Sequence, residues 1–164
     1  MISYTVKLLF ILSFTTLLGC TSALTSGEIA SKETIKINIK ANKVLNPYSG
    51  SEQNPLFIQI VQLKQIERFQ SLDFLSLYQD IEKSLGKDLI YPDLSFPLKP
   101  GTTVTKLIKP ETGANFIGLL YFFSNFEEAT TRHWLPIQPG KNPGKNQCFD
   151  ISFNNIKGVL ERCK

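Results

Sequence analysis

Alternating apolar and polar residues restrict the fold of this chain more than any other feature. Ile35, Ile37 and Ile39 alternate with Lys and Asn residues. Successive side chains of a strand point to opposite faces of its sheet, so this period of two predicts a strand with one buried face. A second strand is predicted over 56–63, which is rich in β-branched and aromatic residues.

Strand signals recur beyond this second segment. Further strands are predicted at 102–108, 114–123 and 132–137 and as a hairpin over 148–163. The run 114–123 is almost continuously apolar, which is typical of a strand buried on both faces. About seven strands and one main helix predict a mostly β protein, a two-sheet β-sandwich with a helical insertion.

The helix is predicted over 71–85, with Ser71 as its N-cap and Gly86 just past its end. Its apolar residues recur at spacings of three and four: Leu72, Leu75, Tyr78, Ile81 and Leu85. Such spacing forms one apolar stripe along a helix. We expect the stripe to pack on the core.

The first twenty residues have the order of a signal peptide. Lys7 precedes the uncharged apolar run 8–19, which is shorter than the roughly 20 residues that span a bilayer. Leu17-Leu18-Gly19-Cys20 then resembles the bacterial lipobox. The resemblance implies that 1–19 is removed and that Cys20 is acylated. An ordinary signal peptide with a chance cysteine, or a buried cysteine in an apolar helix, is the alternative.

Residues 20–33 are predicted to form the lipidated cysteine and a polar tether, and 34–164 the folded domain. Three acyl chains would hold the protein firmly, since each buried methylene contributes ~0.8 kcal/mol. Thr21 lacks the charge of the aspartate that retains lipoproteins in the inner membrane. The lipobox therefore implies a lipid anchor in the outer membrane, on its periplasmic face.

Two cysteines, Cys148 and Cys163, are left after acylation, in a compartment that permits disulfides. They are equally far from a turn centred between Asn155 and Ile156, so a hairpin places them opposite each other. We expect them to pair, and a loop of about 15 residues contributes roughly 3 kcal/mol in the chain-entropy model. Two free buried thiols are the alternative.

Signatures of catalysis are scarce in this sequence. It has no glycine-rich phosphate loop, paired-cysteine metal motif or nucleophile elbow. The single histidine, His133, reads as an exposed residue near a strand edge, and Glu127-Glu128 as a solvated turn. The net charge is +4, but the basic residues form no continuous block, which argues against nucleic-acid binding. We expect no enzyme, cofactor or metal site.

Several short motifs follow one another in a characteristic order. The most specific are Asn46-Pro47, Gln62-Leu63 and the run from Asp73 to Tyr78. The others are Leu85-Gly86, Lys99-Pro100-Gly101, Phe116-Ile117-Gly118 and Trp134, all after the lipobox. In this order they resemble the type VI secretion outer-membrane lipoprotein family, TssJ-like, also called SciN or VasD. The cysteine-bounded hairpin is not part of that family's pattern.

The resemblance implies a transthyretin-like sandwich that recruits the periplasmic C-terminal domain of a TssM-like inner-membrane protein to a trans-envelope complex. It places the contact on the loop between the first two strands, here 41–55. The partner-binding residues are then Asn46, Pro47, Tyr48, Ser49 and Gly50. A long loop without secondary structure is usually functional or disordered, so a mobile loop without a partner is the alternative for this site. For the whole protein the alternative is a lipid-anchored periplasmic binding protein of the immunity type.

Overall fold

The computed structural model describes residues 34–48, 53–137 and 147–163. Eight strands and a group of short helices lie within these ranges. In chain order they are β1 (Ile35–Leu45), β2 (Leu56–Leu63), α2 (Glu67–Ser71), α3 (Phe74–Gln79), α4 (Ile81–Leu85), the 3-10 helix η1 (Gly86–Asp88), β3 (Leu89–Leu98), β4 (Thr103–Ile108), β5 (Phe116–Phe122), β6 (Arg132–Pro136), β7 (Cys148–Asn155) and β8 (Lys157–Arg162).

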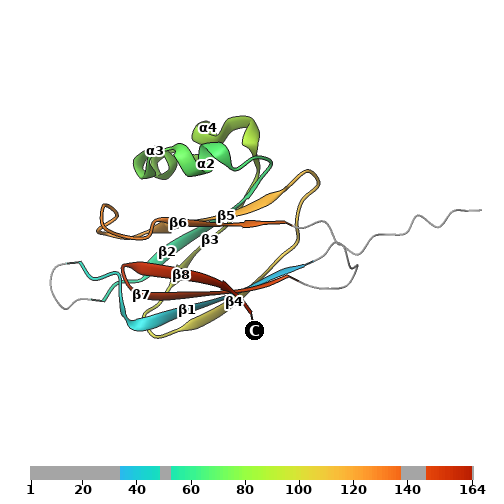
Figure 1. Cartoon of the computed structure of the whole chain (residues 1–164). Helices are drawn as coiled ribbons and strands as arrows, with labels where there is room; N and C mark the ends of the chain where they lie inside the picture. Colours follow the sequence, from blue (N-terminus) through green and yellow to red (C-terminus); the bar gives the residue numbers. More distant parts are fainter. Residues whose placement is uncertain (1–33, 49–52, 138–146, 164) are drawn as a thin grey trace, which may run out of the picture. The chain divides into compact units, whose positions relative to one another are not determined.

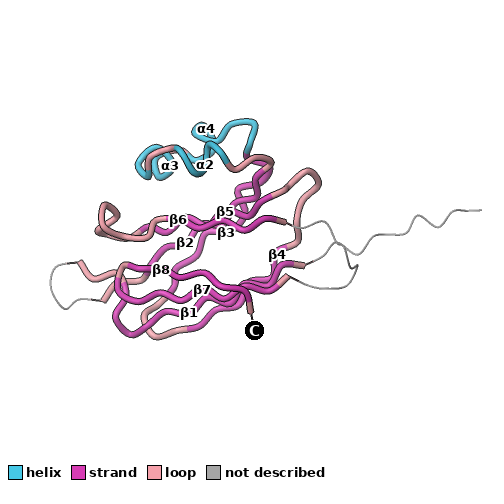
Figure 2. The backbone as a smooth tube through the Cα atoms, in the orientation of Figure 1, coloured by secondary structure: helices cyan, strands magenta, loops and turns pink. Residues whose placement is uncertain are grey.

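The strands form two four-stranded sheets that pack face to face. Their orders are β4-β1-β7-β8 and β3-β2-β5-β6. β1 is antiparallel to β4 and parallel to β7. The helices lie together on the outer side of the second sheet, between β2 and β3 in the chain (Figures 1 and 2). The predicted mostly β sandwich with a helical insertion is confirmed.

Two hydrophobic clusters hold the layers together. The larger lies between the sheets and includes Ile37, Ile58 and Tyr121. The smaller lies under the helices and includes Phe69 and Leu120. β5 contributes to both clusters, because successive residues of a strand point to opposite faces. It is therefore buried on both faces, as the apolar run predicted.

β1 is longer than the sequence predicted. Residues 41–45 were expected to begin the loop, but Ala41 and Leu45 are buried and continue the strand. A register shift against β7 between these two residues accommodates the intervening polar segment. Pairing with β7 supplies hydrogen bonds that the local sequence cannot predict, and the loop therefore starts at Asn46 rather than at residue 41.

β3 is a strand that the sequence did not predict. Pro92 and Pro97 lie within it. Proline has no backbone N–H, so in a central strand it would remove a hydrogen bond to one of the two neighbouring strands. β3 stands at the edge of its sheet and pairs only with β2, so it tolerates both prolines.

The helix predicted over 71–85 is instead a series of short helices that begins earlier, at Glu67. The Asp73 carboxylate accepts a hydrogen bond from the Ser76 N–H at 2.9 Å, and Asp80 does the same for Lys83 at 2.9 Å. Each aspartate is an N-cap that starts a new helix. Gly86 follows the last α-helix, as predicted.

These breaks change which side chains are buried. Leu77, Ile81 and Leu85 pack on the core, but Leu75 and Tyr78 of the predicted stripe are 46% and 60% exposed. The prediction that the whole stripe packs inside is therefore wrong, because a break in the helix resets the direction of every side chain after it.

Arg132 of β6 fastens the helices to the sheet. Its Nη1 donates to the carbonyl oxygens of Phe69 at 2.6 Å and Leu72 at 2.8 Å, at the end of α2. Burial lowers the pKa of this guanidinium, and the charge of Asp73 acts in the opposite direction. Gly118 of β5 allows the Phe69 ring of α2 to lie close to the sheet, since a Cβ at this position would be only 3.0 Å from that ring.

The C-terminal hairpin has the predicted register. Asn154 pairs with Lys157, which leaves Asn155 and Ile156 as the turn. Asn155 has a φ of 58°, a conformation that asparagine adopts more readily than most residues. Cys148 and Cys163 form the predicted disulfide at the open end of the hairpin.

β1 connects the two ends of the sandwich. Its 11 residues span about 35 Å at the usual rise of a strand. We call the end that holds Ile35 the N-terminal end and the end that holds Leu45 the loop end. No helix within the described residues is long and apolar enough to span a membrane.

Candidate binding surface

Asn46 begins the β1–β2 loop (46–55) and is almost fully buried, with 3% of its surface exposed. Its φ of 45° lies in the left-handed region, which turns the chain out of the strand. Its side-chain Nδ2 donates to the carbonyl of Pro55 at 3.0 Å, and its Oδ1 accepts from the Ser124 N–H at 2.8 Å. One amide thus joins both ends of the loop to the chain after β5.

Further hydrogen bonds brace the described ends of this loop. The Leu45 N–H donates to the Gln53 side chain at 2.7 Å. The Asn54 side chain donates to the Asn46 carbonyl at 3.3 Å, and the Asn54 N–H donates to the Leu45 carbonyl at 3.3 Å. The two described ends of the loop are therefore held side by side at the edge of the sandwich.

Tyr48 is the most exposed apolar feature of this braced loop, with 68% of its surface accessible. It lines a hollow of about 530 Å³ together with Pro47 and residues 124–127. We call this the loop hollow. A rigid aromatic side chain on a braced loop resembles the anchors that dominate many protein interfaces.

The turn at 124–128 was not predicted as part of the site. Glu127 and Glu128 are exposed, as expected for a solvated turn. Phe126, which precedes them, is partly buried and lines the loop hollow with Pro47 and Tyr48. The side chain of Asn125 donates to Glu128 at 3.2 Å, and Lys157 of β8 bonds to the Glu128 carbonyl. A lone phenylalanine in a polar turn was the signal available in the sequence.

The predicted partner-binding residues have different positions. Pro47 and Tyr48 line the surface, whereas Asn46 is buried and bonded within the domain. Ser49 and Gly50 lie outside the described residues, as does Cys20.

His133 differs from its sequence-based description as an exposed residue. It is partly buried, and its Nδ1 lies 3.1 Å from the hydroxyl of the fully buried Tyr121. Burial lowers the pKa of His133 and raises the pKa of Tyr121 well above its usual value. The contact between these two side chains joins β5 to β6.

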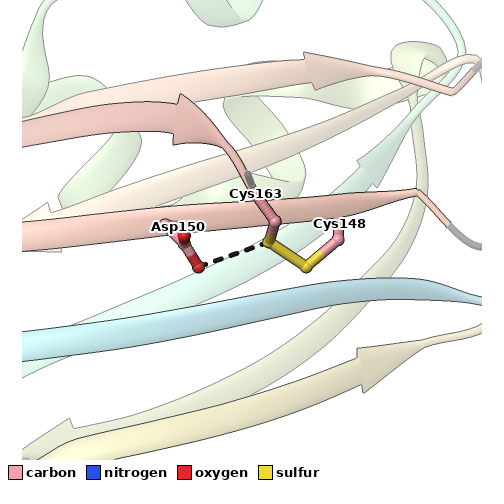
Figure 3. A group of neighbouring side chains, drawn as sticks. All are labelled: Cys148, Asp150 and Cys163. Carbon is pink, nitrogen blue, oxygen red and sulfur yellow. Dashed lines mark hydrogen bonds between the residues drawn. A yellow bond between two sulfur atoms is a disulfide. The ribbon is translucent and has the colours of Figure 1, made fainter.

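Cys148, Asp150 and Cys163 lie close together on the outer face of the first sheet (Figure 3). The two sulfurs are bonded to each other, so neither is a thiolate ligand for a metal in this state. The Asp150 carboxylate accepts a hydrogen bond from the Asn38 amide at 2.8 Å. Its 3.3 Å contact with Cys163 Sγ involves a sulfur that carries no proton. The group is a covalent tie between β7 and the end of β8.

A β-sandwich that presents a braced, aromatic-bearing loop at one end is typical of a binding module. The sequence model of the type VI secretion lipoprotein family, which includes VasD, EvfM and TssJ, matches residues 33–155. This chain belongs to the type VI secretion lipoprotein family. The family is a structural component of the secretion system, which supports the prediction that the chain is not an enzyme.

Solved structures show the same fold. The lipoprotein TssJ1 from Pseudomonas aeruginosa superposes with a TM-score of 0.73 at 21% identity, covering 81% of this chain and 98% of that one. Lip from Serratia marcescens is described as a membrane-bound component of the type VI secretion system. It superposes with a TM-score of 0.68 at 21% identity, covering 80% of this chain and 99% of that one.

A third similar chain comes from a structure described as the C-terminal domain of the type VI secretion protein TssM from EAEC. It has a TM-score of 0.59 at 20% identity, covering 80% of this chain and 98% of that one. No curated protein sequence matches this chain significantly.

Proposed function

We propose that this chain is the outer-membrane lipoprotein of a type VI secretion trans-envelope complex and recruits the periplasmic C-terminal domain of a TssM-like inner-membrane protein. The observation that carries the proposal is the braced β1–β2 loop with exposed Tyr48, on a fold shared with secretion lipoproteins. A similar fold in a structure that names TssM gives further support. Family membership favours this function over an immunity-type protein.

The two ends of β1 suit such a linking role. The proposed segments before the domain are a signal peptide (1–19) and an acylated Cys20 with a tether (20–33), which join the sandwich at its N-terminal end. The loop lies at the other end of β1, about 35 Å away. A protein anchored through Cys20 would thus carry its binding loop away from the point of attachment.

Each residue of the proposed site has a distinct part. Tyr48 and Pro47 contact the partner, and Ser49 and Gly50 belong to the same contact segment. Asn46 is a positioning residue, because its buried amide holds the loop and has no surface to offer.

A comparison of two tyrosines tests the proposal. Tyr48→Ala should weaken binding to the purified periplasmic domain of the partner about thirtyfold, or by ~2 kcal/mol, as for loss of an interface anchor. Its thermal melting should change little, since surface substitutions usually alter stability by less than ~0.5 kcal/mol. Tyr91→Ala, at an exposed tyrosine on β3, is the matched control and should bind as the wild type does. Equal affinity of both variants would move the interface away from the loop.

A further inference from the structure

An aromatic groove lies next to the loop hollow. It has a volume of about 450 Å³ and runs between α3 and the ends of β2 and β5. The lining residues are Phe57, Phe74, Leu75, Tyr78, Phe122, Phe123, Ser124 and Phe126. In Figure 1 the loop end of the sandwich carries α3, the chain after β5 and the described parts of the β1–β2 loop.

Several rings that line the groove pack against one another. The centroid of Phe74 lies 4.9 Å from that of Phe126 and 5.9 Å from that of Tyr78. Tyr78 meets Phe122 edge to face at 5.4 Å. These contacts hold the rings in place before any ligand binds, so little side-chain entropy is lost on binding.

The rim of the groove remains exposed although it is apolar. Leu75 and Tyr78 stand on α3, and Phe57 lies across from them on β2 with half of its surface exposed. Contiguous exposed apolar surface of this kind marks an interaction site more often than isolated exposed residues do. The caps at Asp73 and Asp80 set the helix in the orientation that leaves Leu75 and Tyr78 outside.

The groove and the loop hollow form one continuous surface, because Ser124 and Phe126 line both. As far as described residues line them, the two depressions include Glu127 and no lysine or arginine. Glu127 is therefore the one charged side chain among the described residues that line these depressions. The complement of this surface is an apolar side chain with a basic neighbour.

We propose that the aromatic groove takes an apolar side chain of the same partner protein that contacts Tyr48, on a segment whose basic residue faces Glu127. This inference rests on the proposed function and deepens it. The partner then contacts this chain at two points, Tyr48 of the loop and the aromatic groove beside α3. The helical insertion thereby has a binding role in addition to covering the second sheet.

The experiment measures binding of the full acylated chain, in detergent micelles, to the purified periplasmic domain of the partner. Leu75→Arg should weaken binding at least tenfold, because it replaces an apolar side chain at the rim of the groove with a charged one. Leu107→Arg makes the same change at an exposed leucine on β4 and should bind as the wild type does. Glu127→Lys should slow association, whereas Glu161→Lys on β8 should not.

The outcomes separate this inference from the proposed function. If Leu75→Arg binds like the wild type while Tyr48→Ala binds weakly, the groove inference is overturned and the loop contact stands. If the wild type itself does not bind, both are overturned. Unaltered association of Glu127→Lys removes the basic residue from the inferred partner segment.

A crosslinking measurement keeps the inference testable if Leu75→Arg melts early. A photoreactive amino acid in place of Leu75 should form an adduct with the partner, and one in place of Leu107 should not. An adduct between two copies of this chain, or one within the chain to residues 21–33, identifies a different occupant and overturns the inference.

Discussion

Asn46 shows how one buried side chain shapes a surface loop. Its amide donates to the Pro55 carbonyl and accepts from the Ser124 N–H, and both hydrogen bonds are partly buried. An unpaired buried polar group costs about 1–3 kcal/mol. The sequence singled out Asn46 correctly as part of the loop, but a contact residue and a positioning residue look alike in a sequence.

Replacing Asn46 separates these two roles. Asn46→Ala should lower the free energy of unfolding by about 1–3 kcal/mol and also weaken partner binding, because the loop ends lose their tie. Asn46→Asp keeps the acceptor for Ser124 but sets a carboxylate oxygen against the Pro55 carbonyl in a buried position, so a loss at least as large as that of Asn46→Ala is expected. Chemical denaturation and binding are measured in parallel. Weaker binding of Asn46→Ala with unchanged stability would instead make Asn46 a contact residue.

At the scale of elements, local pattern predicted the strands whose alternation is regular and failed where neighbours decide. β7 and β8 followed their predicted register because a hairpin is a local structure. β3 escaped prediction because its prolines are acceptable only at a sheet edge, a position that the sequence does not reveal. A helix was predicted in the right region, but its division into short helices was missed, because Asp73 and Asp80 act as N-caps instead of continuing the polar face of one long helix.

The disulfide between β7 and β8 gives the prediction at this scale. The isolated protein, denatured without reduction, should expose no thiol from Cys148 or Cys163, and reduction should release two. The double variant Cys148→Ser with Cys163→Ser should lose about 3 kcal/mol of stability, since the bridge closes a loop with a sequence separation of 15. Thiol labelling and urea unfolding measure the two effects. Labelling of two thiols before reduction would contradict the pairing.

For the whole molecule, the proposed arrangement needs both ends of the sandwich to be occupied at once. In this proposal an anchor at Cys20 would precede β1 in the chain, at the N-terminal end, whereas the loop hollow and the aromatic groove lie at the loop end. Removing the anchor should therefore abolish the link while leaving the binding surface intact.

Cys20→Ser tests this separation. It removes the sulfur that would carry the lipid, so the protein should leave the outer-membrane fraction and secretion should stop. The purified variant should still bind the partner domain with wild-type affinity, because the substitution changes none of the residues that line the loop hollow or the aromatic groove. Membrane fractionation and binding are the two measurements. A variant that stays with the outer membrane and supports secretion would show that anchoring does not depend on Cys20.

The sequence by itself determined the sandwich, the hairpin with its disulfide and the family, because alternation, cysteine spacing and motif order can be read directly along the chain. Only the tertiary structure decided that β1 runs on to Leu45, that Asn46 is buried and that Leu75 and Tyr78 rim a groove with Phe57. Each of these depends on residues far away in the chain, since burial and sheet pairing are properties of the assembled layers. The same apolar side chain can fill a core or border a binding surface, and its neighbours in space make the difference.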